Sequence, residues 1–163
     1  MKTCGSCGMC CKLMHIPTLQ KPKHIWCPKY VMRSGCSIYD DRPAECAAFL
    51  CLYLTAPDLS DAWRPDKAKF MIWSGREQRR LIVEVDPASP LAWKQEPYYS
   101  QLKAWSDRGL PDAFEVTVRV GDRVHVVFPE TDIDLGAEQS LPIESGYAIE
   151  AGAYRPYARY VGV

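Results

Sequence analysis

The distribution of cysteine constrains this chain more than any other feature. All eight cysteines lie between residues 4 and 51, and residues 52–163 contain none. An even number of cysteines fits disulfides, but disulfides require an oxidising compartment. The N-terminal residues lack the apolar stretch of a secretory signal. We therefore expect a cytoplasmic protein, and we favour metal ligation over disulfides.

Length and charge argue against several classes of function. A chain of 163 residues is sized for one domain, or for one domain with a small module. No apolar run approaches the ~20 residues that span a bilayer, so we expect no membrane partner. Twenty basic and twenty acidic residues cancel. This balance argues against binding to a phosphate backbone, and hence against a nucleic-acid partner.

The cysteine spacing predicts two metal centres. Four thiolates close a zinc site or an iron–sulfur site. The side chains of adjacent Cys10 and Cys11 diverge, so binding both to one ion would strain the backbone. Cys46 and Cys51 lie about 140° apart on an expected helix, so they serve different centres unless that helix breaks. The candidate metal ligands are Cys4, Cys7, Cys10, Cys11, Cys27, Cys36, Cys46 and Cys51.

The sequence leaves open which four cysteines share a centre. One partition that satisfies both constraints places Cys4, Cys7 and Cys10 on one centre and Cys11 on the other. In each C-x2-C step, the intervening glycine is expected to provide a tight turn, and the backbone N–H groups are expected to donate to sulfur.

The charge distribution agrees with buried thiolates. Residues 1–51 carry seven Lys or Arg and three Asp or Glu, whereas residues 52–163 carry thirteen and seventeen. The basic surplus matches what two dianionic tetrathiolate centres need nearby. Tyr39, Asp40, Asp41 and Arg42 are candidates for supporting an active site. We favour the alternative in which Arg42 neutralises a thiolate site and the two aspartates cap the following helix. The two histidines of this segment, at positions 15 and 24, are surplus to eight thiols.

The cysteine segment resembles a known family. CGSCGMCC, followed by WCPKY, GCSIYDDRPAEC and AAFLC, is similar to the YkgJ-type cysteine-cluster family, a zinc- or iron-chelating domain with a CxxCxxCC signature. The resemblance covers about residues 4–51 and implies metal binding by all eight cysteines, in a family found mostly in bacterial cytoplasmic proteins. It does not fix an activity, since similar clusters occur in flagellin lysine methylases and in iron–sulfur oxidoreductases.

We therefore expect a metal-binding protein with two tetra-cysteine centres and a structural or interaction role, with a protein partner unidentified. We favour zinc over an iron–sulfur cluster. The alternative is an iron–sulfur redox protein, which the C-x2-C-x2-C loop supports, or a metal-dependent protein-modifying enzyme. Whether the chain is an enzyme stays open, because residues 56–163 show no nucleophile–base pair and no phosphate loop.

The expected fold is α+β. An irregular, metal-stapled cysteine module over residues 1–55 packs on a small antiparallel sheet with one or two helices, formed by residues 56–163. The only helix expected in the module runs from Pro43 to Leu54. Alternating and helical patterns predict strands over 69–75 and 79–87, a helix over 97–109, a β-hairpin near 114–128 and a last strand within 146–163.

Two registers are possible for the hairpin. A two-residue loop at 121–122 pairs Val118 with His125, whereas a three-residue loop pairs Val118 with Val126 and places all the valines together. Burial favours the second register, which leaves His125 on the wetter face. We expect a structural role for this histidine.

Overall fold

The structure is a computed structural model in which three stretches of the chain are described, residues 2–75, 79–109 and 113–162. Short helices and small antiparallel sheets confirm the α+β class. In the described stretches, no helix is both long enough and apolar enough to cross a membrane.

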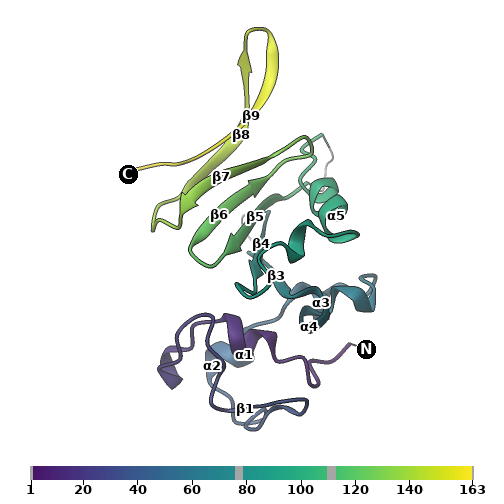
Figure 1. Cartoon of the computed structure of the whole chain (residues 1–163), viewed down its shortest axis with the longest axis vertical. Helices are drawn as coiled ribbons and strands as arrows, with labels where there is room; N and C mark the ends of the chain where they lie inside the picture. The colour runs from purple at the N-terminus through teal and green to yellow at the C-terminus, as the bar shows by residue number, and fades with distance from the viewer. Residues whose placement is uncertain (1, 76–78, 110–112, 163) are drawn as a thin grey trace. The chain divides into compact units, whose positions relative to one another are not determined.

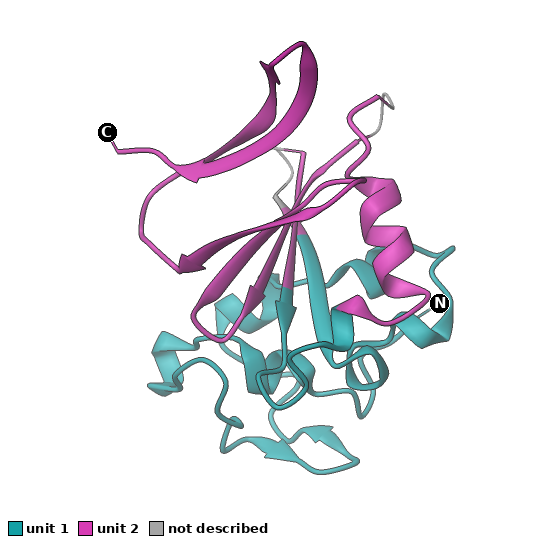
Figure 2. Ribbon diagram, turned by 45° about the horizontal axis from the view of Figure 1, so that its top comes forward, with its two compact units in different colours: residues 1–73, 84–93 teal, residues 74–83, 94–163 magenta. Residues whose placement is uncertain are grey.

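The chain forms two compact units, each coloured separately in Figure 2. The first unit comprises residues 1–73 and 84–93, and the second comprises residues 74–83 and 94–163. All eight cysteines belong to the first unit. Its N-terminal segment therefore shares a compact body with residues 56–73 and 84–93.

Short elements make up the first unit (Figure 1). In chain order they are α1 (Met9–Leu13), η1 (Pro17–Leu19), β1 (Tyr30–Val31), β2 (Gly35–Cys36), α2 (Ala44–Ala48), α3 (Leu52–Thr55), η2 (Asp61–Trp63) and α4 (Pro65–Ala68). Met9, Leu13 and Met71 form a small buried apolar cluster in this unit. Phe49 and Trp73 pack against the cluster, with their rings edge to face at 5.9 Å.

The helix predicted from Pro43 to Leu54 is broken in the structure. Helix α2 ends at Ala48, the backbone is extended at Phe49 and Cys51, and α3 begins at Leu52. The extended residues place the Phe49 ring against Trp73 and the Met9 cluster, which accounts for the break. The expected aspartate cap is also wrong, because the residue before α2 is Pro43 and no side chain caps the helix. Cys46 and Cys51 are therefore not on one helix. The angle of about 140° expected between them does not apply, and it gives no reason to assign them to different centres.

The second unit contains most of a five-stranded sheet, in the order β3-β4-β5-β6-β7, and a separate β8–β9 hairpin. Strands β3 and β4 begin or end in the first unit, because residues 70–73 and 84–85 belong there. The elements are β3 (Phe70–Gly75), β4 (Arg80–Val85), η3 (Ala92–Lys94), α5 (Tyr98–Trp105), β5 (Glu115–Val120), β6 (Arg123–Val127), β7 (Asp132–Ala137), β8 (Ile143–Glu150) and β9 (Ala153–Tyr160).

These elements confirm the predicted strands, the helix and the hairpin, with differences at their ends. Helix α5 stops at Trp105 rather than near Gly109, and the N–H of Ser106, its C-cap, donates to the carbonyl oxygens of Leu102 and Lys103, both at 3.1 Å. Strand β7 was not predicted, and the tail forms a full hairpin instead of one last strand.

The hairpin adopts the register that burial did not favour. Val118 pairs with His125 across a two-residue loop in which Gly121 has φ 64°. The prediction assumed one dry face, whereas both faces are buried: Val116 and Val118 are 0% exposed on one, and Val126 is 0% exposed on the other. His125 therefore lies on the face of Val116 and Val118, where burial lowers its pKa.

Gly8 is required by the packing of the first unit. Its backbone has φ 63°, which L-residues rarely adopt, and a Cβ at this position would overlap the Tyr30 ring. The ring cannot easily move, because it stacks on Trp26 at 4.5 Å between ring centroids and its hydroxyl donates to the Ser6 carbonyl at 3.3 Å. Gly8 thus has the left-handed backbone expected of a turning glycine, and it serves as the N-cap of α1.

We expect Gly8→Ala to destabilise the chain by about 1–3 kcal/mol more than Gly5→Ala, because overpacking adds to the backbone strain. Gly5 is a matched control: it has φ 49°, and a Cβ there would meet only Thr3 Oγ1 at 3.8 Å. Urea denaturation followed by tryptophan fluorescence measures both free energies of unfolding. Equal losses in the two variants would contradict the clash with Tyr30.

Candidate metal centre

All eight cysteines line a single cavity of about 110 Å³ in the first unit. They come from four parts of the chain: the N-terminal loop with α1, the Cys27 turn, strand β2, and the segment from α2 to α3. Cys27 is buried and the other seven are half-buried, and all eight thiols are free. Every cysteine that the sequence nominated as a ligand therefore faces the same space.

Backbone hydrogen bonds hold three of these cysteines together. The Cys27 N–H donates to the Cys11 carbonyl oxygen at 2.9 Å, and the Lys29 N–H points at Cys27 Sγ at 3.5 Å. Strand pairing then places Cys36 opposite Tyr30. An N–H group that donates to sulfur stabilises a thiolate, as expected in a metal-binding turn.

Desolvation dominates the chemistry of the Cys7 thiol. Burial raises the pKa of Cys7 to about 11, although the backbone N–H groups of Met9 and Asp66 partly oppose this rise. The pKa of Cys10 is raised still more strongly, by its hydrogen bond with the Cys11 side chain and then by burial. In the metal-free chain these thiols are therefore protonated at neutral pH.

Mutual repulsion identifies which thiols lie near one another. Burial raises the pKa of Cys46, and negative charge on Cys10, Cys27 or Cys36 would raise it further.

The pKa of Cys51 is likewise raised by burial, and charge on Cys4 or Cys10 adds to the rise, whereas the N–H groups of Tyr53 and Leu54 oppose it. Cys10 thus acts on both of these cysteines, whereas Cys27 and Cys36 act on Cys46 and Cys4 acts on Cys51.

The sulfur atoms line the cavity without converging on one point. Within residues 2–75, 79–109 and 113–162, no three His, Cys, Asp or Glu side chains are close enough together to hold a metal ion. A tetrahedral zinc site needs four sulfur atoms at about 2.3 Å from the ion, so metal binding requires the thiols to move closer together. The donor set itself fits, because eight soft ligands share one largely enclosed space with N–H donors directed at sulfur.

The other predicted residues of the segment lie around the cavity. Arg42 stacks on the Tyr39 ring at 4.0 Å, and its charge lowers the pKa of Cys4 against the larger opposing effect of burial. This agrees with a neutralising role for Arg42. Neither histidine lines the cavity: His15 is exposed, and His24 Nε2 lies 3.0 Å from Glu84 Oε1.

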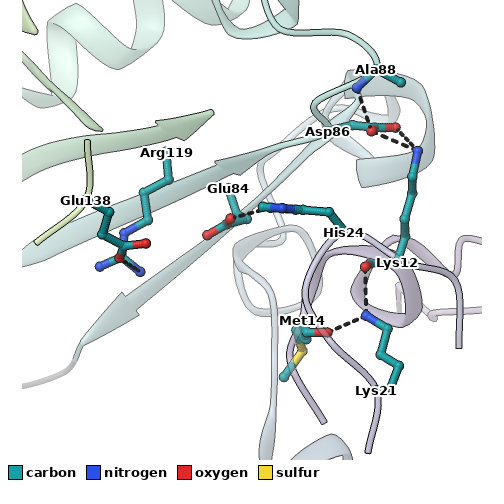
Figure 3. A network of polar contacts seen from close by, with 9 residues as sticks. All are labelled: Lys12, Met14, Lys21, His24, Glu84, Asp86, Ala88, Arg119 and Glu138. Carbon is teal, nitrogen blue, oxygen red and sulfur yellow. Dashed lines mark hydrogen bonds and ion pairs between the residues drawn. The ribbon is translucent and has the colours of Figure 1, made fainter. Parts of the chain in front are cut away.

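The sequence did not reveal the network of polar contacts shown in Figure 3. Lys12 Nζ forms an ion pair with Asp86 at 2.6 Å, and Asp86 also accepts the Ala88 N–H at 3.0 Å. Lys21 is almost fully buried, and its ammonium donates to the Lys12 and Met14 carbonyl oxygens. One signal was present in the sequence: residues 1–39 contain six Lys or Arg and no Asp or Glu, so some must find partners elsewhere.

Comparisons with protein-family models, curated proteins and solved structures give no match to this chain. The resemblance to the YkgJ-type family therefore stays a prediction.

We expect Cys7 in the folded, metal-free chain to react with iodoacetamide about 100-fold more slowly at pH 8 than the same residue in denaturing urea. The thiolate is the nucleophile, and raising the pKa from 9.0 to about 11 lowers the thiolate fraction by that factor. Mass spectrometry of the labelled peptides measures the rates. A folded-state rate that stops rising near pH 9, rather than near pH 11, would contradict the raised pKa.

Proposed function

We propose that the first unit binds metal through all eight cysteines, in two tetra-cysteine centres that stabilise this part of the fold. The observation that carries the proposal is that every cysteine of the chain lines one cavity. Free thiols from four chain segments meet there, although they are far apart in the sequence. Cations in this cavity would link those segments to one another.

The sparse apolar core of the cysteine segment favours a structural role. Among the described residues up to position 55, the buried apolar side chains are those of Met9, Leu13, Ile16 and Cys27. Short segments with few buried apolar side chains commonly depend on a metal for stability. A stabilised surface of this kind also suits an interaction with a protein partner.

The thiol neighbourhoods support one partition of the ligands. In the first centre, Cys4, Cys7 and Cys10 would be joined by Cys51, whose thiol is sensitive to charge on Cys4 and Cys10.

The second centre would take the remaining four cysteines. Charge on Cys10 acts on Cys46 more strongly than charge on Cys27 or Cys36, and the Cys27 N–H donates to the carbonyl oxygen of Cys11. The side chains of Cys10 and Cys11 are hydrogen-bonded to each other in the metal-free chain, contrary to the divergence that their adjacency predicts, so the partition requires metal binding to separate the two thiols.

Zinc is the metal we favour, because eight thiolates close two tetrahedral sites with no open position. An iron–sulfur cluster is the second candidate. It is favoured by the single cavity of about 110 Å³, in which all eight thiols share one space that has room for inorganic sulfide.

Anaerobic purification followed by elemental analysis tests the proposal. We expect two zinc ions per chain and no visible absorption band, and chelation should lower the free energy of unfolding of the first unit, because metal binding and folding are coupled. Iron with matching acid-labile sulfide would support the second candidate. A chain that holds neither metal after anaerobic purification would contradict metal binding altogether.

Single substitutions test the partition. We expect Cys46→Ser and Cys51→Ser each to retain one zinc ion, and the double variant to retain none, because each removes a ligand from a different centre. His15→Ala is the control, since it removes an exposed metal-binding side chain of the same segment and should retain both ions. Elemental analysis gives the stoichiometry. Loss of both ions from either single variant would indicate one shared centre instead of two.

A further inference from the structure

Lys21 carries a charge in a place where water cannot solvate it. The residue is 2% exposed, although lysine is rarely buried without a partner. Its ammonium donates to the Lys12 carbonyl oxygen at 2.7 Å and to the Met14 carbonyl oxygen (Figure 3). These two contacts fix the position of the charge at the end of α1.

The two carbonyl oxygens do not neutralise that charge. An ammonium has three N–H groups, so one remains after the two backbone contacts. Among the described residues, no Asp or Glu forms an ion pair with Lys21, and the nearby aspartate, Asp86, is bound by Lys12. A buried cation needs a negative partner, and the carboxylates of this unit do not provide one.

Lys21 lies beside the cysteine cavity. Met14, whose carbonyl oxygen accepts from the ammonium, lines that cavity, and so does Ile16, whose backbone pairs with that of Lys21. Negative charge on Cys27, Cys11, Cys10 and Cys46 favours the ammonium against the burial that lowers its pKa. Three of these four cysteines belong to the second of the two proposed centres.

We propose that Lys21 is the built-in counter-ion of the centre formed by Cys11, Cys27, Cys36 and Cys46. The inference rests on the proposed metal binding and adds a residue outside the ligand set that stabilises one of the two centres. Four thiolates and one divalent ion have a net charge of 2−, as have four thiolates and an iron–sulfur core of charge 2+. A fixed ammonium stabilises either kind of centre. Its effect is smaller on a site with fewer thiolates, because that site has less negative charge.

The experiment compares variants of the full chain by titration with Zn²⁺ against a chromophoric chelator. We expect Lys21→Met to weaken one of the two zinc affinities by about 10- to 100-fold, as for other outer-shell partners of metal ligands, and to leave the other unchanged. Lys21→Arg, which keeps the charge, should remain closest to the wild type. Lys23→Met is the matched control, because it removes the same charge from an exposed position in the same segment.

Ligand variants locate the effect. In a Cys51→Ser background, where only the second centre is complete, Lys21→Met should weaken the remaining zinc ion. In a Cys46→Ser background it should have no effect on the remaining ion. If Lys21→Met binds both ions with wild-type affinity, the inference is wrong and the proposed function stands. If the wild type binds neither zinc nor iron, the proposed function itself fails.

A second measurement needs no substitution at position 21, and it applies even if Lys21→Met does not fold. Wild-type chain is labelled with acetic anhydride, with Zn²⁺ and then after chelation, and peptides are analysed by mass spectrometry. We expect Lys21 to be labelled at least about tenfold more slowly than Lys23 with metal bound, and to lose most of that protection after chelation. Equal protection of Lys21 in both states would overturn the inference.

Discussion

The burial of eight thiols around one cavity is the constraint on which the first unit depends. Burial raises the pKa of Cys7, Cys46 and Cys51, so desolvation opposes the thiolate form of these side chains in the metal-free chain. Deprotonation without a cation would place several like charges in one desolvated space, which is strongly unfavourable. Cations close to sulfur therefore determine whether this arrangement is stable, and metal ions together with Lys21 and Arg42 are the cations that the chain's chemistry suggests.

The polar contacts shown in Figure 3 follow from the same constraint. Lys21 lies between two residues that are held by the end of strand β4: Lys12 by Asp86, and His24 by Glu84, which is 2% exposed. Because Lys12 and His24 are both held in this way, the segment between them has little freedom to expose the buried ammonium of Lys21. A surface ion pair contributes little to stability, but these pairs are partly or fully buried, and their geometry fixes the position of a charge.

The sequence predicted the elements whose signals are local. Alternation of apolar and polar residues marked β3 to β6, and the C-x2-C spacing marked the turns at Gly5 and Gly8. The predictions from sequence failed where long-range packing determines the structure. The break after Ala48 depends on Phe49 meeting Trp73, which no local pattern reveals, and the hairpin register depends on cover over both faces of the sheet. Lys21 looks like any other lysine in a basic segment, because its burial and its carbonyl partners exist only in the folded chain.

Under the proposed partition, the two centres have the same ligands but different surroundings. One includes Cys27, the buried member of the set, and lies beside an ammonium that is 2% exposed. The other includes Cys4, which interacts with Tyr39, a side chain that is 46% exposed, and with the guanidinium stacked on it. The residues outside the ligand set tune the affinity and potential of a metal site as much as the ligands do. If the proposed partition holds, identical tetrathiolate sets in this chain would therefore produce a shielded centre with a fixed counter-ion and a second centre whose counter-ion is in contact with solvent.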